Sequence, residues 1–273
     1  MMNKVMKILL GGLLIFIFIS GCEEMFEFSP YAANVKEDYK KIGANNLKRV
    51  TELSVSKKGE YKFAVLSDSH YCYHELDEAI KSINSRDDID FVIANGDIAD
   101  HGYMKEYELF HERMKKLKKP YLTAIGNHDY RSNGGAIYRE MYGDPNYSFR
   151  YCGDMFIIWD DVFWESNKNP DFDWLEKQLK NTSNDDNVFV ICHIPPYGDQ
   201  FNSKSEAKYT ELMNRFDVDL SIHGHIHRYK YDKYYKDGID YLATEAILDR
   251  EFVVITVSNV DKQKENKVEI VKY

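Results

Sequence analysis

The chain contains few cysteines for its length, only four among 273 residues. Cys22 closes an apolar N-terminal segment, which leaves Cys72, Cys152 and Cys192 for the rest of the chain. An odd number of cysteines excludes a disulfide framework, although one bridge stays open. Cys192 lies in an apolar run typical of a strand, and we interpret it as a thiol of the core.

Basic residues are also too few to balance the acidic ones. There are 36 lysines and arginines against 45 aspartates and glutamates, for a formal net charge of −9. An acidic surface repels the phosphate backbone, so nucleic acid is disfavoured as a partner, and DNA cleavage as an activity. Internal repeats and low-complexity segments are absent, and the length favours one large domain.

The N-terminal apolar run, residues 8–19, is too short for a comfortable membrane span. It is shorter than the roughly 20 apolar residues that a span needs, and Glu23 and Glu24 follow it closely. Lys4 and Lys7 precede it, as in a secretory signal.

The residues Ile19-Ser20-Gly21-Cys22 resemble a bacterial lipobox, in which cleavage precedes a cysteine that carries lipid. We therefore predict a lipoprotein signal peptide at residues 1–21 and a membrane anchor at lipidated Cys22. The protein would then lie on the extracytoplasmic side of the cell membrane. An uncleaved N-terminal anchor helix is the alternative. Residues 22–58 are polar and predict a tether, with a marginal helix near 38–46, so that the catalytic domain is expected at 59–273.

From residue 61 onward, short β-prone runs alternate with segments of helical apolar spacing, a pattern typical of α/β proteins. The strands that we expect are 61–66, 90–94, 121–125, 147–151, 156–160, 188–192, 218–222, 241–243 and 252–257. The expected helices are 77–84, 103–118, 173–180 and 205–216. We therefore predict two packed mixed β-sheets with helices outside.

Five short polar motifs stand at or just after the ends of apolar runs. They are Asp68-Ser69-His70, Gly96-Asp97-Ile98-Ala99-Asp100, Gly126-Asn127-His128-Asp129, Cys192-His193 and Gly224-His225-Ile226-His227. Each alone has an ordinary interpretation, such as a turn or a helix cap. Because α/β sheets gather ligand sites at the carboxyl ends of their strands, the five together predict one site.

These motifs offer carboxylate, amide and imidazole ligands without a thiolate, which suits two divalent ions such as Mn, Fe, Zn, Ni or Co. Two such ions bring four positive charges, while Asp68, Asp97 and a bridging hydroxide bring three negative ones. The centre would keep one positive charge and attract a phosphate although the protein is acidic.

The motifs resemble the pattern of the calcineurin-like metallophosphoesterase superfamily, D-x-H, G-D-x-x-D, G-N-H-D/E, H and G-H-x-H, over about residues 61–228. The resemblance implies a four-layer α-β-β-α sandwich that holds two metal ions. One ion would be bound by Asp68, His70, Asp97 and His227, and the other by Asp97, Asn127, His193 and His225. It also implies that His128 faces the phosphate and is oriented by Asp100.

These observations predict a phosphoesterase that uses a metal-bridging hydroxide to attack a small-molecule or envelope phosphate ester, with a diester slightly favoured. A phosphomonoesterase and a non-catalytic metal- or partner-binding lipoprotein are the alternatives. Asp129 is expected to be a turn or supporting residue and His223 a core residue. Asp160 and Asp161 are not assigned to catalysis. Residues that could line the substrate rim are Tyr71, Tyr73, Tyr130, Arg131, Pro196 and Tyr197.

Overall fold

The computed structural model describes residues 29, 31–56, 59–183, 186–260 and 263–273. The predicted signal peptide and Cys22 lie outside these residues. Among the helices of the described residues, none is both long and apolar enough to cross a membrane. Cys72 and Cys192 are free thiols, and Cys192 is buried as predicted.

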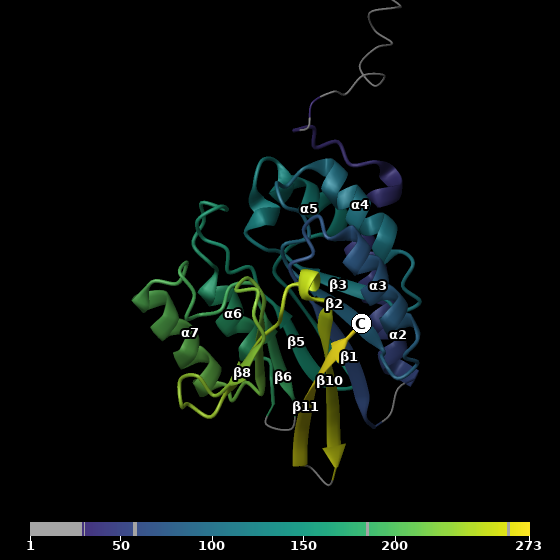
Figure 1. Cartoon of the computed structure of the whole chain (residues 1–273). Helices are drawn as coiled ribbons and strands as arrows, with labels where there is room; N and C mark the ends of the chain where they lie inside the picture. Colours follow the sequence, from purple (N-terminus) through teal and green to yellow (C-terminus); the bar gives the residue numbers. More distant parts are fainter. Residues whose placement is uncertain (1–28, 30, 57–58, 184–185, 261–262) are drawn as a thin grey trace, which may run out of the picture.

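The first β-sheet has five strands in the order β11-β10-β1-β2-β3 (Figure 1). β1, β2 and β3 run parallel, whereas β10 runs antiparallel to both β1 and β11. The bounds are Tyr61–Leu66 for β1, Phe91–Asn95 for β2, Tyr121–Ala124 for β3, Glu251–Val260 for β10 and Gln263–Lys272 for β11.

The second β-sheet has six strands in the order β4-β5-β6-β7-β9-β8. β5, β6, β7 and β9 are parallel, and β4 and β8 run antiparallel at the two edges. The bounds are Tyr147–Tyr151 for β4, Asp154–Ile158 for β5, Val188–Ile191 for β6, Leu220–His223 for β7, Lys230–Asp232 for β8 and Asp240–Ala243 for β9.

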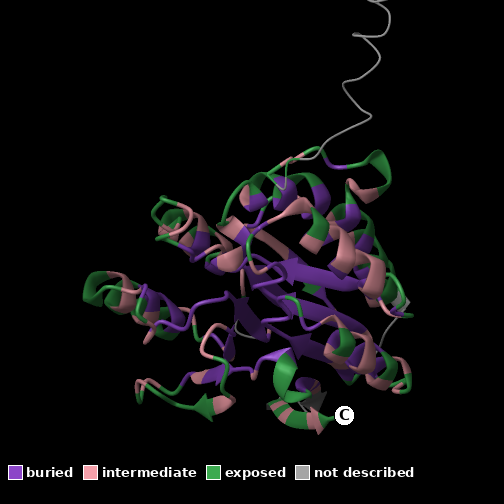
Figure 2. Cartoon of the chain, turned by 45° about the horizontal axis from the view of Figure 1, so that its top comes forward, coloured by how far each residue is buried: buried purple, intermediate pink, exposed green. Residues whose placement is uncertain are grey.

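Helices cover the outer face of each sheet, and Figure 2 shows their exposed sides around the buried strands. The first sheet is covered by α3 (Tyr73–Asn84), α4 (Met104–Met114) and α5 (Gly134–Tyr142), and the second by α6 (Phe172–Leu179) and α7 (Ser203–Arg215). Short 3-10 helices are η1 (Glu37–Tyr39), η2 (His128–Tyr130) and η3 (Ile247–Asp249).

Successive side chains of a strand point to opposite faces of its sheet, and this alternation produces the layers. In β1, Phe63 and Val65 point into the core between the sheets, while Ala64 and Leu66 pack under the helices of the first sheet. The second sheet shares the inner core and has its own outer core under α6 and α7. Three buried cores therefore separate four layers, and the predicted α-β-β-α sandwich is confirmed.

The N-terminal helix α2 (Ile42–Ser56) extends the packed structure beyond the predicted boundary at residue 59. Its Val50 is fully buried in the core between the sheets, and Leu47 packs against the same core. The helix contacts β3 and β4, which are edge strands of the two sheets. Residues 42–56 thus belong to the domain and not to a polar tether, because one apolar face of α2 covers this open side of the sandwich.

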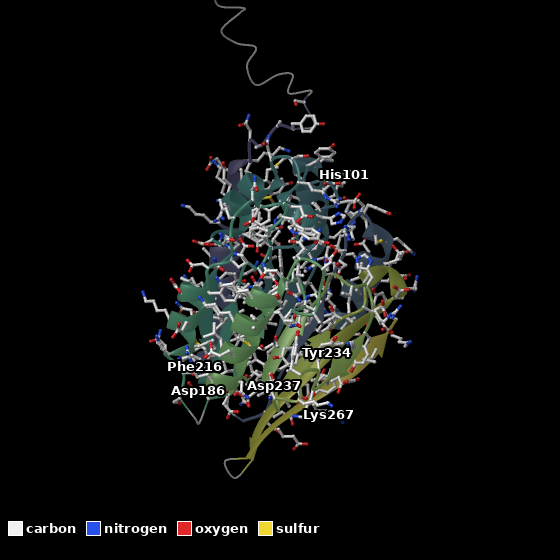
Figure 3. The ribbon with its side chains drawn as sticks, turned by 90° about the vertical axis from the view of Figure 1, so that its left-hand side faces the viewer. His101, Asp186, Phe216, Tyr234, Asp237 and Lys267 are labelled. Atoms are coloured by element: carbon white, nitrogen blue, oxygen red, sulfur yellow. The ribbon has the colours of Figure 1, made fainter. Side chains whose placement is uncertain are left out.

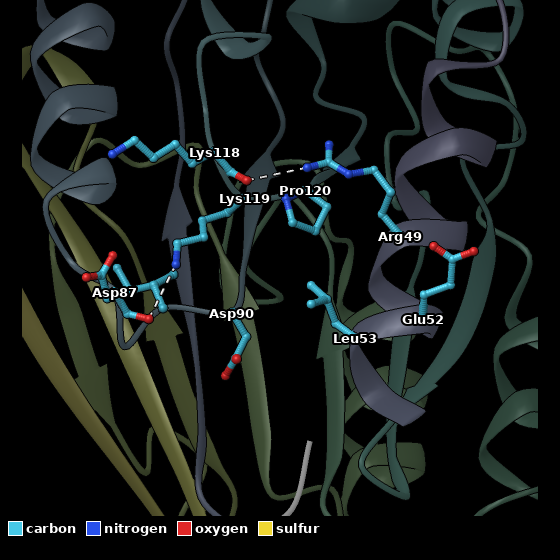
Figure 4. A pocket seen from close by; sticks show the side chains of 9 residues that line it. Arg49, Glu52, Leu53, Asp87, Asp90, Lys118, Lys119 and Pro120 are labelled. Atoms are coloured by element: carbon cyan, nitrogen blue, oxygen red, sulfur yellow. Dashed lines mark hydrogen bonds between the residues drawn. The ribbon is translucent and has the colours of Figure 1, made fainter. Parts of the chain in front are cut away.

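The parallel strands give the molecule two different ends. In Figure 3, His101, which follows the β2 motif, lies at the upper end, and Asp186, Phe216 and Asp237 lie at the lower end, before β6, β7 and β9 begin. A pocket of about 470 Å³ is lined by residues of α2 and by residues that precede β2 and β3 (Figure 4). It therefore lies at the end remote from the motifs.

Candidate metal centre

The loops that follow β1, β2, β3, β6 and β7 bring the predicted ligands together. Among the described residues, three groups of side chains each have ligand atoms within 4.8 Å of one another. They are Asp68, His70 and His227; His70, Asp97 and His128; and Asp97, His193 and His225. Asp97 and His70 each occur in two groups, so the groups form one continuous cluster.

Asp97 is the buried carboxylate at the middle of this cluster. Its Oδ2 lies 3.2 Å from Nε2 of His193 and 3.7 Å from Nε2 of His70. Its Oδ1 accepts a hydrogen bond of 2.9 Å from the backbone N–H of His128. One oxygen is thus held by the backbone, while the other lies close to two imidazoles that belong to different predicted ions, as a bridging ligand requires.

Asp68 is the second buried carboxylate. Its Oδ1 lies 3.1 Å from Nε2 of His227, and its Oδ2 accepts a hydrogen bond of 2.6 Å from the Ser67 hydroxyl. The backbone N–H of His225 also donates to both oxygens. The carboxylate is therefore fixed by groups from both sheets.

The histidine ring of His193 is fully buried and held in one tautomer. Its Nδ1 lies 2.8 Å from the carbonyl oxygen of Asn95, which can only accept, so Nδ1 carries the hydrogen. Nε2 of the neutral ring is then a lone pair, and it has no hydrogen-bond partner among the described residues. A buried lone pair beside two carboxylates fits a cation ligand.

Asn127 faces the same part of the cluster. Its Oδ1 lies 3.0 Å from Nδ1 of His225. The amide oxygen and that imidazole can therefore approach one ion together with His193 and Asp97.

Backbone strain concentrates in these loops. Five of the seven predicted ligands have a positive φ, between 41° and 68°: Asp68, His70, Asp97, His225 and His227. Such angles are uncommon for residues other than glycine and cost about 1–3 kcal/mol each. The motif residues adopt them because this geometry turns their side chains into one centre.

Two motif glycines permit the close packing of the loops. A Cβ on Gly96 would lie 2.4 Å from Nδ1 of His193, and one on Gly126 would lie 2.3 Å from the backbone nitrogen of Asp97. Neither position can hold a larger residue without displacing a ligand.

The ring of His128 lies beside Asp100, the residue that the resemblance implies orients it. Nδ1 of His128 lies 3.1 Å from Oδ1 of Asp100 and 2.9 Å from its carbonyl oxygen. Because both oxygens accept, Nδ1 carries a hydrogen, and Nε2 is the atom that can exchange a proton with a substrate.

The charges in the cluster favour the binding of a cation. Burial alone would raise the pKa of Asp97 and lower the pKa of His193, since it disfavours charge. Their attraction outweighs burial, so the pKa of Asp97 is lowered and the pKa of His193 is raised to about 10. Without an ion, a proton on His193 neutralises the carboxylate, and a metal ion would take the place of that proton.

Several residues near the motifs have structural roles. Asp129 is fully buried and accepts backbone hydrogen bonds from Ala99 and Gly126, which ties two motif loops together. Buried His223 lies 2.8 Å from the Ser221 hydroxyl, and burial lowers its pKa to about 3, so it is a core residue as expected. Asp160 accepts a hydrogen bond from Tyr130.

Sequence reasoning missed the polar groups that contact the cluster from other loops. Glu165 accepts a hydrogen bond from Asn127, Asp199 lies 3.4 Å from Nε2 of His225, and Gln200 contacts Glu165. Their positions depend on tertiary structure, and no motif marks them.

Residues 61–229 match the family model described as calcineurin-like phosphoesterase. A relative from Arcobacter nitrofigilis, described as a probable glycerophosphodiester phosphodiesterase, is 27% identical over 197 residues, which are 66% of this chain and 71% of that protein. A probable cyclic nucleotide phosphodiesterase from Xenorhabdus bovienii is 39% identical over 56 residues, 20% of this chain and 23% of that protein.

Two solved structures show the same fold. GAP50, described as the anchor in the inner membrane complex of Plasmodium, has a TM-score of 0.59 at 15% identity, with 79% of this chain and 85% of that chain covered. A purple acid phosphatase from yellow lupin has a TM-score of 0.57 at 13% identity, with 79% of this chain and 54% of that chain covered. At these identities the likeness concerns the fold alone.

Proposed function

The chain belongs to the calcineurin-like phosphoesterase family and is a hydrolase acting on phosphate esters, and we propose that it is a phosphodiesterase that works with two divalent metal ions. The observation that carries the proposal is the position of Asp97, whose Oδ2 lies 3.2 Å from Nε2 of His193 and 3.7 Å from Nε2 of His70. A carboxylate in that position can serve two ions at once.

We assign Asp68, His70, Asp97 and His227 to one ion, and Asp97, Asn127, His193 and His225 to the other. When bound, the ions would clamp the phosphoryl oxygens and supply hydroxide as the nucleophile near neutral pH. Mixed carboxylate, amide and imidazole ligands suit Mn, Fe, Zn, Ni or Co.

The protein's own acid would be His128. Asp100 holds the proton on Nδ1, so Nε2 can donate a proton to the leaving oxygen of the ester. The side chain of His128 is partly exposed, which leaves it accessible to a substrate. This role needs no movement of the buried ligands.

A diester is favoured over a monoester because both curated relatives are described as phosphodiesterases. A phosphomonoesterase on the same site is the alternative. The same metal centre serves both reactions, and residues at the rim decide between them.

We further propose that the enzyme is anchored outside the cytoplasm by a lipid on Cys22. The support is the sequence of residues 1–22. Near the first described residues, the carbonyl of Tyr31 accepts a hydrogen bond from Asn133, and its ring contacts Tyr103, close to Asp100. The link from Cys22 to Ser29 reaches at most roughly 25 Å, so an anchor would keep the catalytic end near the membrane and its phosphate esters.

The test is hydrolysis of p-nitrophenyl phosphate and bis-p-nitrophenyl phosphate by the full chain in detergent, with Mn²⁺ added. Asp97→Asn is expected to lose bound metal and turnover. Asp173→Asn, whose side chain is 94% exposed, is the matched control and is expected to retain both. Faster cleavage of the diester supports the phosphodiesterase. Two bound ions without turnover on either ester would favour a non-catalytic metal-binding lipoprotein.

The location has a separate test. Mass spectrometry of the chain purified from the membrane fraction should find lipidated Cys22 as the first residue if the lipid is the anchor. A chain that retains residues 1–21 without lipid would favour an uncleaved N-terminal helix.

A further inference from the structure

Glu165 contacts the predicted metal ligand Asn127 from a loop that carries none of the five motifs. The loop follows β5, and Oε1 of Glu165 accepts a hydrogen bond of 3.2 Å from Nδ2 of Asn127. Its other oxygen, Oε2, accepts a hydrogen bond of 2.9 Å from Nε2 of Gln200. Both oxygens of this carboxylate are therefore engaged by amides.

The direction of the first hydrogen bond decides which atom Asn127 offers to a cation. An asparagine amide has nearly the same shape with its oxygen and nitrogen exchanged, but only the oxygen binds a metal ion. An ionised carboxylate can only accept, so Glu165 must face the NH₂ group. The oxygen of Asn127 then points the other way, where it lies 3.0 Å from Nδ1 of His225.

Gln200 fixes Glu165 by the same logic. The side chain of Gln200 is buried, and its Oε1 accepts from the backbone N–H groups of Phe163 and Trp164 at 3.3 and 3.2 Å. Because those two groups can only donate, the NH₂ group of Gln200 must face Glu165. The hydrogen bond between Gln200 and Glu165 and the one between Glu165 and Asn127 therefore each have one possible direction.

We propose that Glu165 is a positioning residue for the second metal ion, the one assigned to Asn127, His193 and His225, and that Gln200 holds Glu165 in place. The inference rests on the proposed function, which puts an ion at Asn127. Glu165 locks the amide with its oxygen toward the ion and polarises that oxygen with a negative charge. Partners of metal ligands change affinity typically 10–100-fold when they are lost.

Glu165→Gln tests the proposal with almost no change of shape. The introduced amide has one acceptor and one donor side. If it accepts from Asn127, its NH₂ group meets the NH₂ group of Gln200. If it turns over, its NH₂ group meets the NH₂ group of Asn127, and the ligand amide is driven to turn as well.

The double variant Glu165→Gln with Gln200→Glu is the rescue. The new carboxylate at position 200 accepts from the two backbone N–H groups and from the new amide at position 165, which in turn accepts from Asn127. The hydrogen bond between positions 165 and 200 is reversed, every donor meets an acceptor again, and the net charge is that of the original chain. Glu211→Gln on α7, with a side chain 53% exposed, is the control for loss of one charge.

The measurement is equilibrium binding of Mn²⁺ to the full chain, with spin coupling between two bound ions followed by electron paramagnetic resonance. We expect Glu165→Gln to weaken one of two sites about 10–100-fold, to reduce the coupled signal and to leave the melting temperature of the metal-free protein unchanged. The double variant should recover most of the affinity, and Glu211→Gln should bind as the original chain does.

Two results would overturn the inference while leaving the proposed function intact. One is unchanged affinity at both sites in Glu165→Gln. The other is equal weakening at both sites with a lower melting temperature and no rescue, which would mean that Glu165 only stabilises its loop. If the original chain binds fewer than two ions, the proposed function itself fails, and this inference fails with it.

Discussion

The backbone N–H of His225 donates to both carboxylate oxygens of Asp68, at 3.2 and 3.1 Å, although 157 residues separate the two in sequence. Asp68 follows β1 of the first sheet, and His225 follows β7 of the second. The loops of the two sheets are thus joined by a hydrogen bond to a predicted metal ligand. The metal centre and the junction between the sheets are the same piece of structure.

Metal binding should therefore stabilise the whole sandwich. Ions that bind the folded chain alone add about 2.7 kcal/mol per site at a free concentration 100 times the dissociation constant. The melting temperature should rise with added Mn²⁺ and fall with a chelator. Asp97→Asn should show little of this rise, and a rise of full size in that variant would contradict the assignment of the bridging ligand.

Gly96→Ala should cost both stability and metal affinity. Gly96 has a φ of +84°, and a Cβ there would lie 2.4 Å from the His193 ring. Gly238 has a φ of +91° with nothing within 4 Å of a Cβ, so Gly238→Ala carries a similar backbone cost without the clash.

We expect about 1 kcal/mol of destabilisation for the control, and more than that, with weakened metal binding, for Gly96→Ala. Denaturant unfolding and metal titration of both variants provide the measurement. Equal losses in the two variants would show that the close approach of Gly96 to His193 has no consequence.

Helix α2 offers a comparison of two identical substitutions. Val50 is fully buried between the sheets, whereas Val55 on the same helix is 83% exposed. Val50→Ala should lower the free energy of unfolding by about 2 kcal/mol, because it leaves a cavity in the core. Val55→Ala should change it by less than about 0.5 kcal/mol. Similar small effects at both positions would mean that α2 is the tether that the sequence suggested.

The layers and the candidate metal ligands could both be predicted from the sequence, because both depend on short-range patterns. β1 was predicted with its observed bounds, because its consecutive apolar residues 63–66 indicate a strand with two buried faces. The motifs were recognisable because each follows such a strand. In both cases the residues that carry the signal are neighbours in the chain.

The rest of the fold and of the candidate site depends on contacts between residues that are distant in the sequence. β11 was missed because residues 263–267 are all polar and only three apolar residues follow them, and it is a strand through pairing with β10. α2 was taken for a tether because few of its residues are apolar, yet Val50 fills the core. Glu165 is 38 residues from Asn127, and only the folded loops bring the two together.

His128→Ala should separate catalysis from metal binding. A ring nitrogen of His128 lies within 4.8 Å of ligand atoms of His70 and Asp97, so it is close enough to be a ligand as well as an acid. We expect both ions to stay bound while kcat falls about 100- to 10,000-fold, because proton delivery to the leaving oxygen is lost. A substrate with a more acidic leaving group should lose less. Loss of one ion from His128→Ala would instead make His128 a ligand.

Asp161 should make the stability of the metal-free protein depend on pH. It is fully buried, its Oδ2 accepts a hydrogen bond of 3.0 Å from the backbone N–H of Ile194, and its Oδ1 has no partner among the described residues. Burial raises its pKa from 3.8 to about 7. Between these two values the folded chain holds a proton that the unfolded chain has released.

The free energy of unfolding that protonated Asp161 contributes is therefore fully present below pH 4. It is lost as pH rises to about 7, by up to roughly 4 kcal/mol. Asp161→Asn cannot ionise, so its stability relative to the original chain should increase across that range and level off above it. Urea unfolding in chelator at pH 4.5, 6 and 8 measures the difference. Exposed Asp173→Asn should run parallel to the original chain, and a parallel curve for Asp161→Asn would show that this carboxyl is already ionised at low pH, with its charge balanced inside the fold.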